Sequence, residues 1–427
     1  MCWPMTRAVL LILALFLPAL ALAQPTWSKE VSRIVQAKCE GCHRPGDIAP
    51  FSLTNYDEVS TWAQDIKRVV TDRYMPPWKP VAGNFRDFWG LTEEERKTIL
   101  DWIDAGTPLG DPADLPESLP RSGPWPLGEP DLVLEMPEPF EVTRGRDIYR
   151  CFVLSPNLEE DKWISAIQVL PGNRQIVHHV VLFTDDSGQA EKLDAAEEGP
   201  GYTCFGGPGF DVNITNLSTF DLLGGSWAPG MRARHLPEGI GMFLSRKSKI
   251  VMQVHYFPSG RPGVDRSKIG LYFTKPGKKL RFVPLRNTTF RIPPGEEKTV
   301  TEQLTIPLFM DAQAVVIAPH MHLIGRKIKV ELERRNEITE LIRIDDWDFN
   351  WQSFYTFAEP VDLRPGDRLK LTCTFDNSDK NPRNPFNPPQ EVRWGEGTRD
   401  EMCLAFIGTV FKFDVFPFTG QGQPVWK

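Results

Sequence analysis

Two patterns of hydrophobic positions divide the chain into a helical part and a β part. Between residues 27 and 108 apolar side chains such as Ile99, Trp102 and Ile103 fall on one face of a helix of 3.6-residue period. From residue 131 onward the pattern changes to short runs of Val, Ile, Phe and Thr, broken by Gly, Pro, Asn and Asp. Such runs are typical of β-strands. The sequence predicts a mainly β protein with a small all-α domain at its N-terminal end.

Boundary signals mark the end of the helical part. Thr92 and Glu95 form a capping box, which predicts the start of a helix, and Gly106 followed by Pro108 predicts its end. Residues 108–130 carry seven prolines, and so proline-rich a stretch forms neither a helix nor an inner strand. We therefore expect residues 109–130 to be a stiff linker, jointed at Gly123 and Gly128.

The β region reads as a series of strands with no helical pattern between them, which favours antiparallel β-sandwiches. The expected strands include Asp131–Glu135, Trp163–Val169, Ile176–Phe183, Ile250–Tyr256, Ala314–Ile317, Ile328–Leu332, Leu369–Phe375 and Leu404–Phe411. This region of roughly 290 residues is too long for one sandwich, and K-P-G-K-K-L at residues 275–280 makes a plausible seam. We expect two tandem, jelly-roll-like sandwiches, residues 131–276 and 277–427.

The first 23 residues have the pattern of a secretory signal. They open with Arg7, run apolar from Ala8 to Leu22, and close on Ala21-Leu22-Ala23. A membrane anchor is the alternative, but the run is short for a span and no later segment is long enough. The net charge is −7 with both signs well mixed, so nothing points to nucleic acid. We expect an exported protein, periplasmic or secreted, without a membrane span in its mature form.

The helical part, residues 24–108, carries the motif C-E-G-C-H, with Cys39, Cys42 and His43. C-x-x-C-H is the attachment signature of c-type haem, in which two thioethers hold the porphyrin and the histidine becomes an axial ligand. A redox C-x-x-C is the alternative, but it needs a βαβ setting and leaves His43 unexplained. Met75, the only methionine between the motif and the linker, is the expected sixth ligand rather than a core side chain. Helix, C-x-x-C-H, methionine loop and helix together resemble a small class I cytochrome c domain.

Five of the seven histidines fall in three strand-like runs: His178, His179, His255, His320 and His322. Residues i and i+2 of a strand share a face, so the last two imidazoles would lie side by side, and a metal is a ready partner for such a buried pair. Adjacent residues face opposite ways, so the first two could share a metal only at a strand end or a bulge. Whether they do is left open by the pattern.

Four motifs in order carry a resemblance: H-H-V-V-L-F, Q-V-H-Y, H-M-H-L-I-G-R-K and D-E-M-C at Asp400–Cys403. From about Asp131 to Phe416 the chain resembles the type II copper monooxygenases, the family of peptidylglycine α-hydroxylating and dopamine β-monooxygenases. The resemblance implies two copper ions per chain. One would be an electron-transfer copper and the other would meet O₂ and substrate. The ligands implied are His178, His179 and His255 for the first, and His320, His322 and Met402 for the second. A thioether favours Cu(I), the form that binds O₂.

Four further cysteines, Cys151, Cys204, Cys373 and Cys403, allow three pairings. The resemblance implies Cys151–Cys204 and Cys373–Cys403. The chain also departs from the family. The peptide-amidating members clamp a substrate carboxylate with an arginine two residues before H-x-H and with polar residues after the methionine. Here those places hold Ala318, Leu404 and Phe406, which indicates an apolar pocket.

The sequence therefore predicts a haem- and copper-dependent monooxygenase that hydroxylates a C–H bond of a small-molecule substrate with O₂. It would carry one haem c and two copper ions, and a protein or small-molecule donor would supply electrons through the haem. We expect the haem domain to dock transiently near His178, His179 and His255. The alternative is a copper and haem protein that relays electrons without oxygenating anything. His235 matches no ligand position and reads as a surface histidine.

Overall fold

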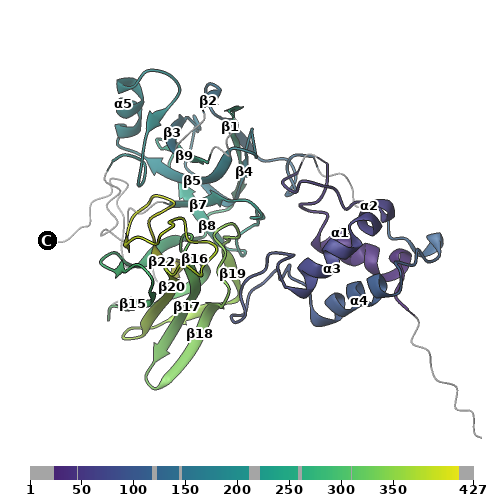
Figure 1. The fold of residues 1–427 in the computed structure, drawn as a ribbon. Helices are drawn as coiled ribbons and strands as arrows, with labels where there is room; N and C mark the ends of the chain where they lie inside the picture. Colours follow the sequence, from purple (N-terminus) through teal and green to yellow (C-terminus); the bar gives the residue numbers. More distant parts are fainter. Residues whose placement is uncertain are drawn as a thin grey trace, which may run out of the picture.

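The computed structural model describes residues 24–45, 47–117, 123–143, 147–210, 222–257, 262–308 and 310–412. The expected signal segment and part of the expected linker, residues 118–122, lie outside the described residues. The described chain is mainly β, with its N-terminal helices gathered to one side of the β region (Figure 1). No described helix is long and apolar enough to cross a membrane.

The helical part has one small core. Its elements are η1 (Trp27–Val31), α1 (Ser32–Lys38), α2 (Tyr56–Thr61), α3 (Ala63–Thr71), α4 (Glu93–Asp104) and the 3₁₀ turn η2 (Pro112–Asp114). The capping box is confirmed: the Thr92 hydroxyl accepts from the Glu95 N–H, and the Glu95 carboxylate accepts from the Thr92 N–H. Ile99, Trp102 and Ile103 of α4 are buried in the core of the helical part, where α4 contacts η1 and α3.

The first β domain has two five-stranded sheets around one core. Their orders are β1-β11-β4-β8-β12 and β6-β3-β9-β5-β7, and a short pair, β2 and β10, lies beside them. The strands are β1 (Leu132–Glu135), β2 (Phe140–Val142), β3 (Ile148–Leu154), β4 (Lys162–Leu170), β5 (Val177–Asp185), β6 (Tyr202–Thr203), β7 (Leu222–Trp227), β8 (Ile240–Leu244), β9 (Lys249–Tyr256), β10 (Gly263–Asp265), β11 (Lys268–Thr274) and β12 (Lys278–Lys279).

The expectation that no helix interrupts the strands was wrong. Helix α5 (Gln189–Ala196) lies between β5 and β6, at the upper edge of the first β domain in Figure 1. Its sequence, Q-A-E-K-L-D-A-A, consists largely of good helix formers, and the Asp185 carboxylate accepts from the N–H of Ala190 in its first turn (2.8 Å). A helix of eight residues has only about two turns. This is too short for a helical period of apolar residues to be recognised in the sequence.

The second β domain has two four-stranded sheets, β13-β22-β16-β19 and β15-β20-β17-β18, with the short pair β14 and β21 beside them. The strands are β13 (Arg281–Asn287), β14 (Arg291–Ile292), β15 (Glu297–Thr305), β16 (Ala312–His320), β17 (Gly325–Arg334), β18 (Glu337–Ile344), β19 (Tyr355–Leu363), β20 (Arg368–Asp376), β21 (Val392–Arg393) and β22 (Cys403–Phe411). Every strand expected from the sequence is present, with bounds shifted by a few residues.

Both implied disulfides are confirmed, as Cys151–Cys204 and Cys373–Cys403. The second bond joins β20 to β22 and so ties the two sheets of the second β domain together. At the expected seam, β12 pairs with β8 of the first β domain before the chain enters β13. The two domains also share apolar contacts, since Leu280 and Phe282 belong to the first core.

The helical part is anchored more firmly than the sequence suggested. Residues 78–89, which we call the arm, reach across to β18 and β19 (Figure 1). Phe85 of the arm forms a β-bridge with Phe357, and the Trp78 ring packs edge-on against Tyr355 with centroids 5.4 Å apart. The arm thus packs on the second β domain, while Asp47 of the helical part pairs with Arg174 of the first β domain (2.8 Å). The expected transient contact of the haem domain near the first histidine cluster stays a prediction.

The linker is also less free than expected where the structure describes it. Trp125 is buried, and the Tyr272 hydroxyl donates to the Gly128 carbonyl (2.8 Å). The Gln168 side-chain amide donates to the Pro124 carbonyl (2.9 Å). Residues 123–130 are therefore fixed to the first β domain rather than forming a joint at Gly123 and Gly128.

Candidate metal centres

Three histidines converge in the first β domain. His178 and His179 lie on β5 and His255 lies on the neighbouring β9, where it is the register partner of His179. The β5–β9 register shifts between Val177 and His179, so a bulge falls at His178. The bulge re-aims one of two adjacent side chains, which is the condition left open by the sequence.

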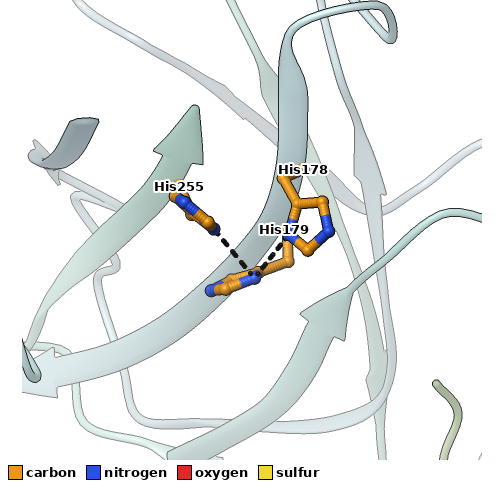
Figure 2. A group of neighbouring side chains, drawn as sticks. All are labelled: His178, His179 and His255. Carbon is orange, nitrogen blue, oxygen red and sulfur yellow. Dashed lines mark hydrogen bonds between the residues drawn. The ribbon is translucent and has the colours of Figure 1, made fainter. Parts of the chain in front are cut away.

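The ring nitrogens of this cluster meet at Nδ1. Nδ1 of His179 lies 3.2 Å from Nδ1 of His178 and 3.4 Å from Nδ1 of His255 (Figure 2). All three residues offer a ligand atom within 4.8 Å of the others. One ring nitrogen of a neutral imidazole carries no proton and can bind a metal, so a single ion at this point would satisfy three donors at once.

The surroundings of the first cluster keep His178 and His179 neutral. Burial lowers the pKa of His178 to about 4 and holds that of His179 well below its usual value, with the neighbouring histidines adding to the effect. Nε2 of His255 is buried without a hydrogen bond among the described residues, and the nearest carboxylate oxygen, of Asp147, is 3.6 Å away. Neutral, buried imidazoles are the form in which histidine binds copper. The donor set therefore fits copper.

The second cluster is built at the end of a strand. β16 ends at His320, and His322 lies beyond it, so the shared strand face predicted for this pair was wrong for His322. The two rings are nevertheless neighbours, with centroids 5.0 Å apart. Burial lowers the pKa of His320 to about 4 and that of His322 to about 3.

Each Nδ1 of the second cluster has its own partner. Nδ1 of His320 lies 2.5 Å from Oε1 of Gln352, and Nδ1 of His322 lies 3.0 Å from the carbonyl oxygen of Asp400. Both partners are acceptors, so each Nδ1 carries the proton and each Nε2 is left as the ligand atom. The first cluster thus gathers its Nδ1 atoms, whereas the second presents Nε2.

Glu401 holds the segment of Met402 against the second cluster. Its fully buried carboxylate accepts from the backbone N–H groups of His322 (2.8 Å), Ile324 (2.7 Å) and Met402 (3.2 Å). Burial raises the pKa of Glu401 to about 8, while these N–H groups favour its charged form. Met402 itself is half-buried and precedes Cys403 at the start of β22. Its thioether as the third ligand stays a prediction.

An aromatic ring lies between the two clusters. Phe349 stacks on His178 with ring centroids 4.9 Å apart and meets His322 edge-on at 5.7 Å. Phe349 and Gln352 belong to the same loop, residues 345–354, between β18 and β19. The cluster of each β domain therefore faces the cluster of the other, and the loop that carries Phe349 contacts both.

The C-x-x-C-H segment has features that suit a haem. Nδ1 of His43 lies 3.2 Å from the carbonyl oxygen of Phe51, which leaves Nε2 as the ligand atom. Cys39 and Cys42 are free thiols. Met75 follows α3, is half-buried, and donates its backbone N–H to Val69 (3.1 Å). Its role as sixth ligand stays a prediction.

Sequence reasoning missed the groups that orient the ligands. Gln352, Phe349 and Asp147 stand in no recognisable motif, and their partners are distant in the chain. Glu401 could have been suspected from its place next to Met402 in D-E-M-C. His235 is exposed, as expected, with Nδ1 2.9 Å from the Ser165 hydroxyl.

Comparison with known proteins matches part of the second β domain to a family of copper monooxygenases. Residues 285–411 match the model of the family "Copper type II ascorbate-dependent monooxygenase, C-terminal domain". This range includes His320, His322 and Met402 and covers most of the second β domain.

Relatives from animals match a longer part of the chain. The chain is 25% identical over 261 residues to human DBH-like monooxygenase protein 1, covering 55% of this chain and 39% of that protein. It is 26% identical over 271 residues to dog dopamine beta-hydroxylase, covering 56% of this chain and 38% of that protein. The chain thus spans about two fifths of the length of these relatives. Among solved structures, a mutant VP2 protein of infectious bursal disease virus aligns with a TM-score of 0.19, 8% identity and coverage of 69% of this chain and 72% of that one, which carries no argument.

Proposed function

We propose that this protein is an exported monooxygenase that hydroxylates a C–H bond of a small-molecule substrate. In the balanced reaction the C–H bond, O₂, two electrons and two protons give C–OH and one water. The observation that carries the proposal is a pair of histidine clusters of unlike design, each half-buried or buried, on either side of the Phe349 ring. Copper bound at the two clusters would supply the one-electron steps that O₂ reduction needs.

The residues of each cluster take different parts in this proposal. Nδ1 of His178, His179 and His255 would hold the electron-transfer copper. Nε2 of His320 and His322, with the Met402 thioether, would hold the copper that serves O₂ and substrate. Gln352 and the Asp400 carbonyl keep the second pair in the required tautomer.

The substrate should be apolar around its reacting carbon. Ala318 and Leu404 are buried, and Ala318 pairs with Phe406 across the β16–β22 ladder beside His320. None of these side chains can bind a carboxylate. Peptide amidation, which requires such a clamp, is therefore not the proposed reaction.

Haem c, attached at Cys39 and Cys42 with His43 and Met75 as axial ligands, would be the place where electrons enter from a protein or small-molecule donor. The signal-like N-terminus and two disulfides support an oxidising compartment such as the periplasm.

Turnover under ¹⁸O₂ tests the proposal directly. The copper-loaded protein is given a reductant and a panel of apolar metabolites, and products are analysed by mass spectrometry. We expect one ¹⁸O atom in the product, with O₂ consumed in step with product. His235→Gln, at an exposed histidine, should behave like the wild type, whereas His322→Ala should give no product. Oxidation of the haem and coppers without oxygen incorporation would instead identify an electron relay.

A further inference from the structure

The β18–β19 loop contacts both histidines of the second cluster. The Trp347 indole N–H donates to the His322 carbonyl (3.2 Å), and Oε1 of Gln352 lies 2.5 Å from Nδ1 of His320. Phe349 meets the His322 ring edge-on, and the Gln352 amide donates to the Phe349 carbonyl (2.8 Å), which joins these contacts to one another. The orientation of both imidazoles therefore depends on where this loop is held.

The arm holds the loop at both of its ends. Where the loop leaves β18, the Val81 N–H donates to the Arg343 carbonyl (2.8 Å). Where the loop enters β19, the Arg86 N–H donates to the Thr356 carbonyl (3.0 Å). The arm thus pairs its backbone with the last residues of one strand and the first residues of the next, and it bridges the two ends of the loop between them.

The arm also reaches the loop itself through Lys79. Nζ of Lys79 lies 2.9 Å from the carboxylate of Asp346, and the lysine side chain is 6% exposed whereas the aspartate side chain is 61% exposed. A buried ammonium is costly without an anionic partner, so this lysine favours the loop position in which Asp346 is within reach. Arg383 of the second β domain lies 3.7 Å from the same carboxylate, which keeps a second cation beside it.

The arm lies directly against β18 at Gly83. The φ angle of Gly83 is +113°, and a Cβ at this position would be 2.6 Å from the carbonyl oxygen of Leu341. This contact is too short for any side chain, and the backbone conformation is one that glycine adopts without strain. An alanine here would therefore push the arm away from the strand.

We propose that the arm is a positioning element of the second copper centre: it holds the β18–β19 loop, and the loop orients His320 and His322. Lys79 and Gly83 are positioning residues in this arrangement, because they act on the ligands through the loop. This inference rests on the copper-binding role that the proposed function gives to the second cluster. It does not depend on haem.

Hydrogen–deuterium exchange of the metal-free full chain tests the hold of the arm on the loop. Gly83→Ala should make the amides of the β18–β19 loop exchange about tenfold faster, because the strained and crowded alanine favours local opening. Gly106→Ala is the matched control. Gly106 ends the helical part's α4 with a φ angle of +83°, and a Cβ there would meet no atom of the described chain within 4 Å. Exchange in the loop should be unchanged in this control.

Competitive titration with a Cu(I) chelator tests the effect on the metal. In a His179→Ala background, where the second cluster keeps its whole ligand set, Gly83→Ala should lower the Cu(I) affinity about tenfold, the lower end of the range for lost partners of metal ligands. Lys79→Met should lower it about threefold, because it removes one ion pair and leaves the backbone pairing of the arm intact. Lys79→Arg, which retains the cation, should restore the affinity.

Two controls separate this effect from a general loss of stability. Lys67→Met removes an ion pair with Asp104 that lies within the helical part, and it should leave the Cu(I) affinity unchanged. In a His322→Ala background, the arm variants should leave the affinity of the first cluster unchanged, because no Nδ1 of that cluster is hydrogen-bonded to the loop in the described chain.

The outcomes distinguish the inference from the proposed function. Unchanged loop exchange in Gly83→Ala, an unchanged affinity of the second cluster, or an equal loss at both clusters would overturn the inference and leave the copper assignment untouched. A His179→Ala protein that binds no copper would overturn the ligand set of the second cluster, and with it both the proposed function and the inference.

Discussion

The two histidine clusters consist of the same kind of side chain, but different structural elements position the rings in each. In the first cluster, the histidines lie on paired strands. The hydrogen-bond contacts of their Nδ1 atoms are with the Nδ1 of a neighbouring histidine. In the second, a strand ends and loop residues fix each ring from outside. The first cluster therefore depends on the register of a sheet, and the second on loops that can be altered without breaking a sheet.

This difference agrees with the roles that the proposed function gives to the two clusters. A site that only passes electrons needs a constant ligand geometry, which a sheet supplies. Under the proposed function, the site that binds O₂ and substrate needs an open position, which ligands oriented by loops can leave more readily than ligands within a sheet. The predictions below run from the largest expected difference between the clusters to the smallest.

Removing one ligand at a time should empty one cluster and leave the other loaded, which is the largest expected effect. His179→Ala and His322→Ala should each bind one copper in place of two and lose hydroxylation, because each takes away a central donor. Copper content by elemental analysis and product formation by mass spectrometry check this. Two coppers retained in either variant would remove that histidine from the ligand set.

Removing the disulfides compares the two domains. The chain separations of 53 residues for Cys151–Cys204 and 30 for Cys373–Cys403 predict losses in the free energy of unfolding of about 4 and about 3.5 kcal/mol when both cysteines become serine. Only the second pair should also weaken copper binding, since Cys403 follows Met402. Urea unfolding of the two double variants measures the loss in the free energy of unfolding, and copper titration measures their copper affinity. Equal copper affinities in the two variants would show that the Cys373–Cys403 bond does not support the second cluster.

Acid should destabilise the metal-free protein through both clusters. The folded-state pKa values of His178 and His320, about 4, lie below the roughly 6.5 of an unfolded histidine, so the unfolded state binds protons first. Stability should fall as pH drops from about 6.5 to 4, by up to about 1.4 kcal/mol per pH unit for each buried histidine. Urea unfolding between pH 7.5 and 5 measures this slope. A flat profile in the wild type would contradict the neutral state of these histidines.

Gln352→Leu should act on the second cluster alone. Loss of the acceptor for His320 Nδ1 frees the ring and its tautomer, and changes of this kind lower metal affinity by about 10–100-fold. The first cluster has no contact of this type and should keep its affinity. Competitive titration with a Cu(I) chelator resolves the two sites, and an equal loss at both would show that the loop acts on the whole interface.

Much of this molecule could be read from the sequence because its signals are local. Strand runs, the capping box of α4 and the closeness of the His320 and His322 rings each depend on a few neighbouring residues. The bulge at His178 could not be read, because a register shift depends on β9, more than seventy residues away. The link from Gln352 to His320 was hidden for the same reason, since nothing near either residue marks the other.

The docking of the helical part shows a different limit. A proline-rich stretch predicts a stiff linker, yet Trp125 and Gly128 are held by the first β domain and the arm packs on β18 and β19. Composition describes the linker alone and contains no information about the surface that receives it. The apolar arm residues Trp78 and Phe85 were the only hint of that contact.

X-ray absorption of the fully reduced, copper-loaded protein tests the central claim, that the two clusters are unlike copper sites, most directly. The account predicts imidazole nitrogen at both coppers and one sulfur scatterer per two coppers, which disappears in Met402→His while copper content stays at two per chain. His179→Ala should keep the sulfur signal on its remaining copper. A sulfur signal that survives Met402→His, or its absence from the wild type, would contradict the assignment of the second cluster as the site of oxygen chemistry.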